Sequence, residues 1–336
     1  KTGHTASNEP VSTHSLRLGI DIGSVSSDVI VLDDRDHVIF KDYRRTLARP
    51  VETILEQLKQ LFSTIPTTRF ERMGFTGSAG RLAAQILSAT FINEVRAQAI
   101  GSAHLYPEFS QATVIEMGGQ DSKLIFLASR QDSLELKDFA INSVCAAGTG
   151  SFLDQQAERL GVPIEEEFGR LAIESKSVPQ MAGRCSVFAK SDMIHLQQVA
   201  TPVCDILAGL CLALARSLKS NLGCGQEFVR PIVFTGGVAA NAGVVRAFEN
   251  VLGLEEGELL VPTLHFYTGA LGAALAADET SGKYAQTAVE KIEAYLKDGT
   301  SAHQRIPHRE PLVTPVLPEP QSRMYSERLM THPGQE

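Results

Sequence analysis

The feature that most limits how this chain can fold is an internal repeat. Residues 20–32 align without a gap on residues 115–127, at an offset of 95 positions. Each copy has an acid two positions before a glycine, then small polar residues, then a strand-like apolar run. A duplicated strand–turn–strand unit predicts two similar lobes that face each other across a cleft, with one turn from each lobe beside the same ligand.

Strand and helix patterns alternate along the chain, which favours an α/β fold. Alternating or β-rich apolar runs predict strands at 16–22, 29–32, 113–117 and 231–234, and the first two form a hairpin. Helical periodicity covers 51–62 and 80–87 and resumes after Asn93. It returns at 151–160, 186–199, 202–222 and 242–250.

These patterns divide the chain into five parts. We expect a flexible tail at 1–15, a first lobe at 16–112, and a second lobe at 113–267. C-terminal helices follow at 268–300, the first returning to the first lobe, and 301–336 is a tail with six prolines. Because the chain begins with Lys1 rather than Met, we expect it to be trimmed or part of a longer product.

Composition excludes several classes of partner. A net charge of -8 and a sequence pI near 5.7, with scattered Lys and Arg, argue against nucleic acid. No apolar run is long enough to span a membrane and no signal peptide is visible, so we expect a cytoplasmic protein with no membrane partner. Five cysteines in 336 residues do not suit a secreted disulfide framework, so we expect reduced thiols.

The two repeated turns have the composition of phosphate-binding turns, because glycine lets several backbone N–H groups approach an anion. Asp21 and Glu116 stand at the strand ends, where a carboxylate would hold Mg²⁺ through water. Gln120 and Asp121 are placed to orient a water that attacks the γ-phosphate, and with Glu116 they are the candidate catalytic residues. The candidate cradle comprises Gly23, Ser24, Ser26 and Ser27 from the first turn, and Gly118, Gly119 and Gln120 from the second.

A third glycine motif follows the strand at 231–234. Gly236 and Gly237 would let a flat adenosine lie against bare backbone, beside Val238 and Asn241 at the start of a helix. Gly269 begins a small-residue segment that we expect to pack close to this site. A tight strand-to-helix turn and ordinary helix packing are the plainer interpretations of these two patterns.

Two cysteines precede predicted helices. At a helix N-terminus the dipole favours a thiolate or a negatively charged cluster, so Cys145 and Cys185 are candidate metal ligands. Two thiols are too few for a cubane cluster, and a two-fold dimer would supply the other two. A lone cysteine is more often a small buried hydrophobe, and this is our interpretation of Cys204 and Cys211.

The motifs around these residues resemble those of a known family. The chain is similar, from about Leu16 to Ala276, to the ATP-dependent activators of 2-hydroxyacyl-CoA dehydratases and the ATP-binding subunits of benzoyl-CoA reductase, within the acetate and sugar kinase/Hsp70/actin superfamily. The resemblance rests on the glycine motifs and on the two segments that carry Cys145 and Cys185, which kinases of the superfamily lack. Glu116 departs from it, because the family usually has Asp there.

The resemblance implies a two-lobed actin-like ATPase fold, with duplicated ribonuclease-H-like lobes and ATP in the cleft between them. It also implies an oxygen-sensitive homodimer in which Cys145 and Cys185 of both subunits bind one [4Fe-4S] cluster. Ferredoxin or flavodoxin would supply an electron, and ATP hydrolysis would drive it to a client iron–sulfur enzyme. The client would be a dehydratase, a benzoyl-CoA reductase-like enzyme or a double-cubane cluster protein.

Two other functions remain open at this point. A small-molecule kinase of the same superfamily would phosphorylate a sugar or a carboxylic acid, with Asp121 or another carboxylate as base, and would contain no cluster. A nucleotide-gated binding module, similar to a chaperone, would tolerate loss of Cys145.

Overall fold

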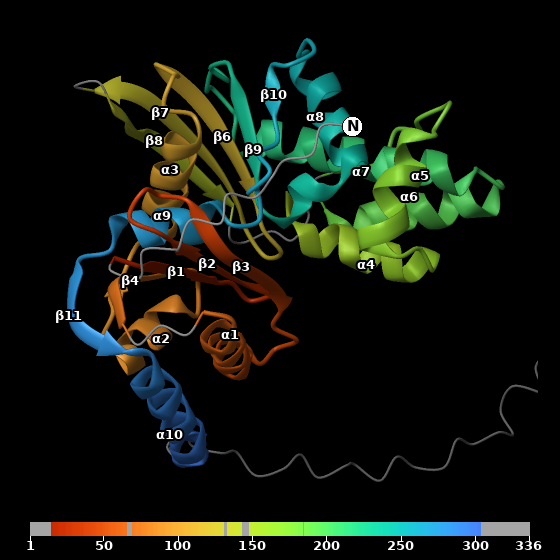
Figure 1. Cartoon of the computed structure of the whole chain (residues 1–336). Coiled ribbons are helices and arrows are strands. Elements are labelled where there is room, and N and C mark those ends of the chain that lie inside the picture. Colours follow the sequence, from red (N-terminus) through yellow and green to blue (C-terminus); the bar gives the residue numbers. More distant parts are fainter. Residues whose placement is uncertain (1–14, 66–68, 131–132, 143–147, 184, 304–336) are drawn as a thin grey trace, which may run out of the picture. The chain divides into compact units, whose positions relative to one another are not determined.

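A computed structural model describes residues 15–65, 69–130, 133–142, 148–183 and 185–303 (Figure 1). The described residues up to Leu296 form one compact unit, and Lys297 to His303 fall outside it. The compact unit contains two mixed β-sheets, and each sheet is built around a hairpin from one copy of the repeat.

The first sheet has the strand order β11-β4-β1-β2-β3, with the short strand β5 beside β4. β1 and β2 form the predicted antiparallel hairpin, and β4 lies parallel to β1. The strands are β1 (Arg17–Ile22), β2 (Ser26–Leu32), β3 (Val38–Arg45), β4 (Arg69–Thr76), β5 (Thr90–Phe91) and β11 (Glu279–Tyr284).

The second sheet has the order β10-β9-β6-β7-β8 and repeats the local topology of the first. In each sheet, the hairpin has an antiparallel strand on one side and a parallel strand on the other, so β8 and β9 correspond to β3 and β4. The duplication therefore extends beyond the aligned residues. The strands are β6 (Gln111–Met117), β7 (Ser122–Arg130), β8 (Ser133–Asn142), β9 (Ile232–Thr235) and β10 (Leu259–Leu260).

The helices lie close to their predicted positions. Helix α3 begins where Asn93 caps it, because the Asn93 side chain accepts hydrogen bonds from the backbone of Val95 and Arg96. The helices are α1 (Pro50–Thr64), α2 (Gly80–Leu87), α3 (Glu94–Leu105), α4 (Gly150–Leu160), α5 (Gly169–Ile173), α6 (Ser186–Gln198), α7 (Val203–Asn221), α8 (Ala242–Leu252), α9 (Thr268–Ala276) and α10 (Ala285–His303). A π-helical turn (Ile164–Phe168) runs into α5, and a 3-10 turn (Gly237–Ala240) precedes α8.

Helices α3 and α9 lie between the two sheets (Figure 1). α9 packs against β1 and β4, and α3 packs its Val95 and Ala99 against the second sheet. The two helices approach so closely that a side chain at Gly272 would collide with the Ala97 carbonyl. The small-residue composition of α9 thus permits a helix pair to join the two sheets.

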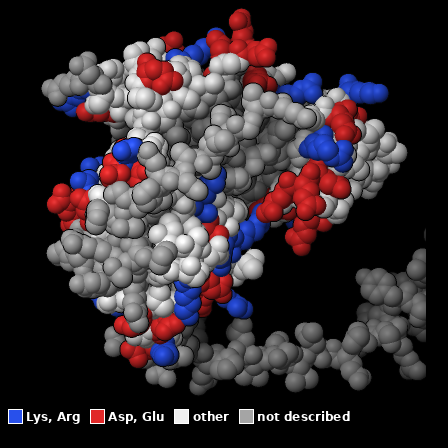
Figure 2. All heavy atoms as spheres, in the orientation of Figure 1, with Lys and Arg blue, Asp and Glu red and all other residues white. Residues whose placement is uncertain are grey.

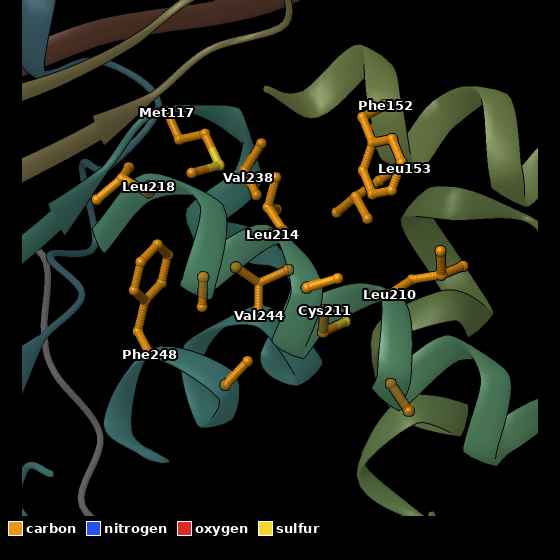
Figure 3. Packing of buried hydrophobic residues seen from close by; sticks show 14 of the residues in the cluster. Met117, Phe152, Leu153, Leu210, Cys211, Leu214, Leu218, Val238, Val244 and Phe248 are labelled. Carbon is orange, nitrogen blue, oxygen red and sulfur yellow. The ribbon is translucent and has the colours of Figure 1, made fainter. Parts of the chain in front are cut away.

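The largest core cluster surrounds α7 in the part of the chain that carries the second sheet (Figure 3). Cys211 lies in this cluster beside Leu210, Leu214 and Val244, with 1% of its surface exposed. Burial raises the pKa of its thiol to about 12, so Cys211 is the inert core residue that we expected. Cys204 is only partly buried, and its sulfur lies 3.9 Å from Asp205 Oδ1.

The surface is mixed in charge. Figure 2 shows Lys and Arg interspersed with Asp and Glu over the face in view, rather than gathered in one basic patch. Within the described ranges, no helix combines the length and apolar character needed to cross a bilayer.

Candidate functional site

The two turns of the repeat have the same backbone geometry and lie against each other. In the first turn the Gly23 N–H donates to the Ser26 carbonyl at 2.9 Å, and at the equivalent positions Gly118 donates to Asp121 at 3.1 Å. A Cβ atom added at Gly119 would lie 2.8 Å from Val25 Cβ, so the second turn meets the first without room for a side chain. This contact between the two turns lies at one edge of the cleft that the repeat predicts.

A cavity of about 270 Å³ opens between these turns and contains most of the predicted phosphate-site residues. From the candidate set it is lined by Asp21, Gly23, Ser24, Ser26, Glu116, Gly118, Gly119, Gln120, Asp121, Gly236 and Gly237. Residues that sequence reasoning did not select also line it, and they include Asp28, Glu94 and Lys123. The cavity therefore combines bare backbone, hydroxyls and many carboxylates.

A second cavity of about 550 Å³ shares Ser26, Gly119 and Gly237 with the first, so the two form one cleft. It is lined by the other two residues predicted to contact adenosine, Val238 and Asn241. Phe266 also lines both cavities and packs against Tyr43, with ring centroids 4.7 Å apart and ring planes tilted by 52°. This larger, less polar space has the size and lining that a nucleoside requires.

Gly236 forms the sharp turn between β9 and the 3-10 turn that lines the larger cavity. Its φ of 87° lies in the region that favours glycine, and a Cβ would collide with the Met117 carbonyl. At Gly237 an added Cβ would meet nothing closer than Phe266 Cε1 at 4.0 Å. The backbone here is therefore open to a flat ligand.

Lys123 is the cation at the centre of the second turn. Its ammonium lies 2.8 Å from Glu116 Oε2, 2.8 Å from Asp121 Oδ2 and 3.1 Å from Glu94 Oε2. Burial alone would lower the pKa of Lys123. The three carboxylates raise it by more than burial lowers it, so the net shift of the pKa is upward. Lys123 is therefore charged, and it fixes the orientation of two candidate catalytic carboxylates.

The first turn has no such cation among the described residues. Burial raises the pKa of Asp21 to about 7, and the carboxylates of Glu94 and Glu116 add to the effect against the opposing charge of Lys123. Asp28 faces Asp21 across the hairpin, and burial, then Asp21, raises its pKa well above the ordinary value. Its Oδ1 atom is buried without a hydrogen-bond partner.

Two predicted nucleotide-site residues, Ser27 of the cradle and Gly269 beside the adenosine motif, line neither cavity. Ser27 is fully buried, and its hydroxyl donates to Gln57 Oε1 at 2.7 Å, because β2 turns this side chain toward α1. Gly269 lies beneath Asp21, where a side chain would collide with the Asp21 carboxylate. These two residues support the site from behind.

The two cysteines are placed differently. Cys145 lies outside the described residues. Cys185 directly precedes α6 and is half-buried, and it lines neither cavity. On α6, Val187 and Phe188 are each 65% exposed, so the helix start beside Cys185 presents an apolar surface.

Helix α4, which follows the segment with Cys145, is attached directly to the second turn. The N–H groups of Gly150 and Ser151 donate to the carbonyls of Gly118 and Gly119 at 2.9 and 2.8 Å. These are first-turn N–H groups that the helix itself cannot satisfy. A displacement of the second turn would therefore move the start of α4.

Arg45, at the end of β3, reaches across the larger cavity. Its guanidinium lies 2.9 Å from Glu165 in the π-helical turn and 3.5 Å from Asp154 in α4. No local pattern in the sequence identifies Arg45, because its partners are 109 and 120 positions away.

Comparison with known proteins gives one consistent result. Residues 18–277 match the BadF/BadG/BcrA/BcrD ATPase family. The sequence is 33% identical to the (R)-2-hydroxyglutaryl-CoA dehydratase activating ATPase of Acidaminococcus fermentans, over 79% of this chain and 98% of that protein. It is 31% identical to the 2-hydroxyisocaproyl-CoA dehydratase activator of Clostridioides difficile, over 82% of this chain and 99% of that protein.

Solved structures give the same picture. Component A of the Acidaminococcus fermentans (R)-2-hydroxyglutaryl-CoA dehydratase superposes with a TM-score of 0.69 at 29% identity, covering 82% of this chain and 99% of its own. The activator of the 2-hydroxyisocaproyl-CoA dehydratase from Clostridium difficile, solved with bound ADPNP, superposes with a TM-score of 0.68 at 29% identity, covering 84% and 97%.

Proposed function

The chain belongs to the BadF/BadG/BcrA/BcrD ATPase family and has the two-lobed actin-like ATPase fold, and from this premise we propose that it is a reductive activator. As a homodimer with one bridging [4Fe-4S] cluster, it couples ATP hydrolysis to the transfer of a low-potential electron to a partner iron–sulfur enzyme. The family supports the ATPase activity, and the relatives named as dehydratase activators support a client enzyme.

We assign the two connected cavities to the two ends of the nucleotide. The smaller cavity takes the phosphates, because both glycine turns present backbone to it. The larger cavity takes adenosine, against Gly237 and Val238. One structural neighbour was solved with bound ADPNP, which supports a nucleotide in this cleft.

The acidic lining suits a magnesium ion. Asp21 lies at the end of β1 in the smaller cavity, and the unpaired oxygen of Asp28 offers a further ligand atom. Within the described residues, no three acidic, His or Cys groups stand together as a metal site, so water and phosphate would supply the other ligands. When bound, Mg²⁺ supplies charge neutralisation for the phosphates.

We assign the positioning of the attacking water to Gln120. Glu116 and Asp121 each have one carboxylate oxygen held by the Lys123 ammonium, at 2.8 Å. Gln120 is exposed at the cavity and can donate and accept hydrogen bonds. Glu116 and Asp121 then fix the second turn and orient water through their free oxygens.

We assign the cluster to Cys145 and Cys185 of both subunits. A bound [4Fe-4S] cluster supplies one-electron chemistry at low potential. Cys185 directly precedes α6, where the helix dipole favours a negatively charged cluster, and the exposed Val187 and Phe188 fit a protein interface beside it. Ferredoxin or flavodoxin is the donor that we propose.

The single observation that carries this function is the attachment of α4 to the second turn. The carbonyls of Gly118 and Gly119 bind the first turn of the helix that follows Cys145, and the same turn lines the phosphate cavity. A change at the γ-phosphate thus has a short path to the proposed cluster. Coupling requires that the nucleotide bind one arrangement of this turn better than another.

The test is to purify the full chain without oxygen and to measure iron, acid-labile sulfide and the visible spectrum with and without dithionite and ATP. We expect about four irons per dimer, a spectrum bleached by reduction, and loss of iron in Cys185→Ser. Cys211→Ser, in the core, is the matched control and should retain iron. Absence of iron together with ATP turnover that depends on an added small acceptor would replace the proposal with a kinase.

A further inference from the structure

The smaller cavity has a large excess of negative charge. It is lined by five carboxylates, those of Asp21, Asp28, Glu94, Glu116 and Asp121, and by one ammonium, that of Lys123. Lys123 already contacts Glu94, Glu116 and Asp121 at 2.8 to 3.1 Å. Asp21 and Asp28 have no ion-pair partner in the described part of the chain, so a polyphosphate entering beside them would meet uncompensated charge.

The internal repeat shows what is missing at this position. Asp21 pairs with Asp28 across the β1–β2 hairpin, and at the equivalent positions Glu116 pairs with Lys123 across β6–β7. Directly opposed residues have Cβ atoms only about 5 Å apart. In the second hairpin the acid is therefore opposed by an ammonium, whereas in the first hairpin it is opposed by another acid.

Asp28 has the properties of a ligand without its partner. Its side chain lines the cavity, only 7% of the residue is exposed, and Oδ1 has no hydrogen-bond partner. Buried carboxylate oxygens are normally satisfied, because an unpaired one keeps its desolvation cost.

We infer that Asp28 and Asp21 bind a divalent cation directly, at the place in the first hairpin that the Lys123 ammonium holds in the second. A 2+ ion matches two carboxylates, and oxygen ligands select hard ions such as Mg²⁺ or Mn²⁺. The two carboxylates would hold this ion before nucleotide binds, so this inference concerns the nucleotide-free protein. The inference rests on the acidic cavity and does not depend on electron transfer.

The test uses the full chain without nucleotide and Mn²⁺ as the probe, with free Mn²⁺ counted by electron paramagnetic resonance. Asp28→Asn removes the charge of the ligand, and Asp28→Lys supplies the ammonium that the second hairpin has. Asp34→Asn makes the same charge change at an exposed position of the β2–β3 connection and is the matched control. Circular dichroism verifies that each variant is folded.

We expect wild type and Asp34→Asn to bind one Mn²⁺ per chain, competed by Mg²⁺. Asp28→Asn should bind it at least tenfold more weakly, and Asp28→Lys should show no binding. Equal Mn²⁺ binding by wild type and folded Asp28→Asn, or none by wild type, would overturn the inference. ADPNP binding is measured separately on the same proteins, so that retained nucleotide binding without the cation site would reject only this inference.

Discussion

The two hairpins of the repeat have one backbone and two different roles. Both close their turns with the same hydrogen bond, from Gly23 in one copy and from Gly118 in the other. The Val25 carbonyl of the first turn accepts from Thr46, four residues before α1, whereas the carbonyls of the second turn accept from the start of α4. The first turn therefore contacts the connection between β3 and α1, whereas the second turn contacts the start of the helix after Cys145.

The charges differ as well. The second hairpin neutralises its acid with Lys123, while the first leaves Asp21 and Asp28 facing each other. The acid of the second hairpin thus has its counter-charge within the protein, whereas we propose that a bound cation supplies it in the first. On these proposals, the first hairpin binds the cation and the second links the phosphate cavity to α4.

Removing the charge of the second hairpin should have the largest effect. Lys123→Met would leave three carboxylates without their shared ammonium, so we expect the free energy of unfolding to fall by about 3 kcal/mol or more. Urea denaturation at pH 7 measures this change. Lys291→Met, on the exposed side of α10, is the control and should cost less than about 0.5 kcal/mol. Similar values for the two variants would contradict a buried charge network.

The contact between the turns can be tested by a double-mutant cycle. Gly119→Ala places a Cβ 2.8 Å from Val25 Cβ, and we expect it to cost about 1–3 kcal/mol and to weaken ADPNP binding at least tenfold. Val25→Ala alone should have a smaller effect on binding. Combined with Gly119→Ala, it should restore part of the lost affinity, because the closest contact of the added Cβ, with Val25 Cγ2, is then removed. Strictly additive losses would show that the two turns act independently.

The first hairpin predicts an unusual pH dependence of stability. The pKa of Asp21 is about 7 in the fold and near 3.8 in an unfolded chain, so between these values the folded chain holds a proton that the unfolded chain has released. Stability in the absence of divalent cations should therefore fall as pH rises from about 4 to 7, by on the order of 2 kcal/mol. Denaturation at several pH values in EDTA measures it.

Asp21→Asn is the variant that sharpens this pH prediction, because it removes the titrating group and should flatten the profile. Excess Mn²⁺ should also reduce the slope in wild type, since a cation that requires the ionised carboxylate competes with the proton. A stability that rises with pH over this window would contradict the assignment of a raised pKa to Asp21.

Many of the residues that line the cleft are predictable from the repeat. There is a physical reason why the others are not. An alignment of two copies selects what they share, which here is the acid, the glycine and the small polar residues. It overlooks Asp28 and Lys123, where the copies differ and each reads as one more strand residue. Glu94 is positioned only by the packing of α3 on the second sheet, so no local pattern marks it.

The strands show the same limit. β1, β2, β6 and β7 are largely buried and give clear apolar patterns, whereas β3 and β8 are outer strands with many charged, half-exposed residues. Their pairing depends on the neighbouring hairpin rather than on their own sequence. The sequence therefore predicts the central hairpins well and their outer neighbours poorly.

The smallest effect that we expect concerns Arg45, the link between the sheets at the larger cavity. Its ion pairs with Glu165 and Asp154 are partly exposed, since 38% of the Arg45 side chain and 66% of the Glu165 side chain are accessible. Such pairs contribute about 0.5 kcal/mol, so Arg45→Gln should barely change stability. Arg45 spans the cavity that we assign to adenosine. The Arg45→Gln variant should therefore release ADP about twofold faster than wild type at low salt, with a smaller difference at 0.5 M salt. Stopped-flow release of a fluorescent ADP analogue measures this, with Arg170→Gln, which lines the same cavity but pairs within its own helix turn, as control. Equal release rates for Arg45→Gln and Arg170→Gln at both salt concentrations would show that the ion pairs of Arg45 do not slow nucleotide release. The influence of the first sheet on the nucleotide would then be confined to the Asp21–Asp28 hairpin.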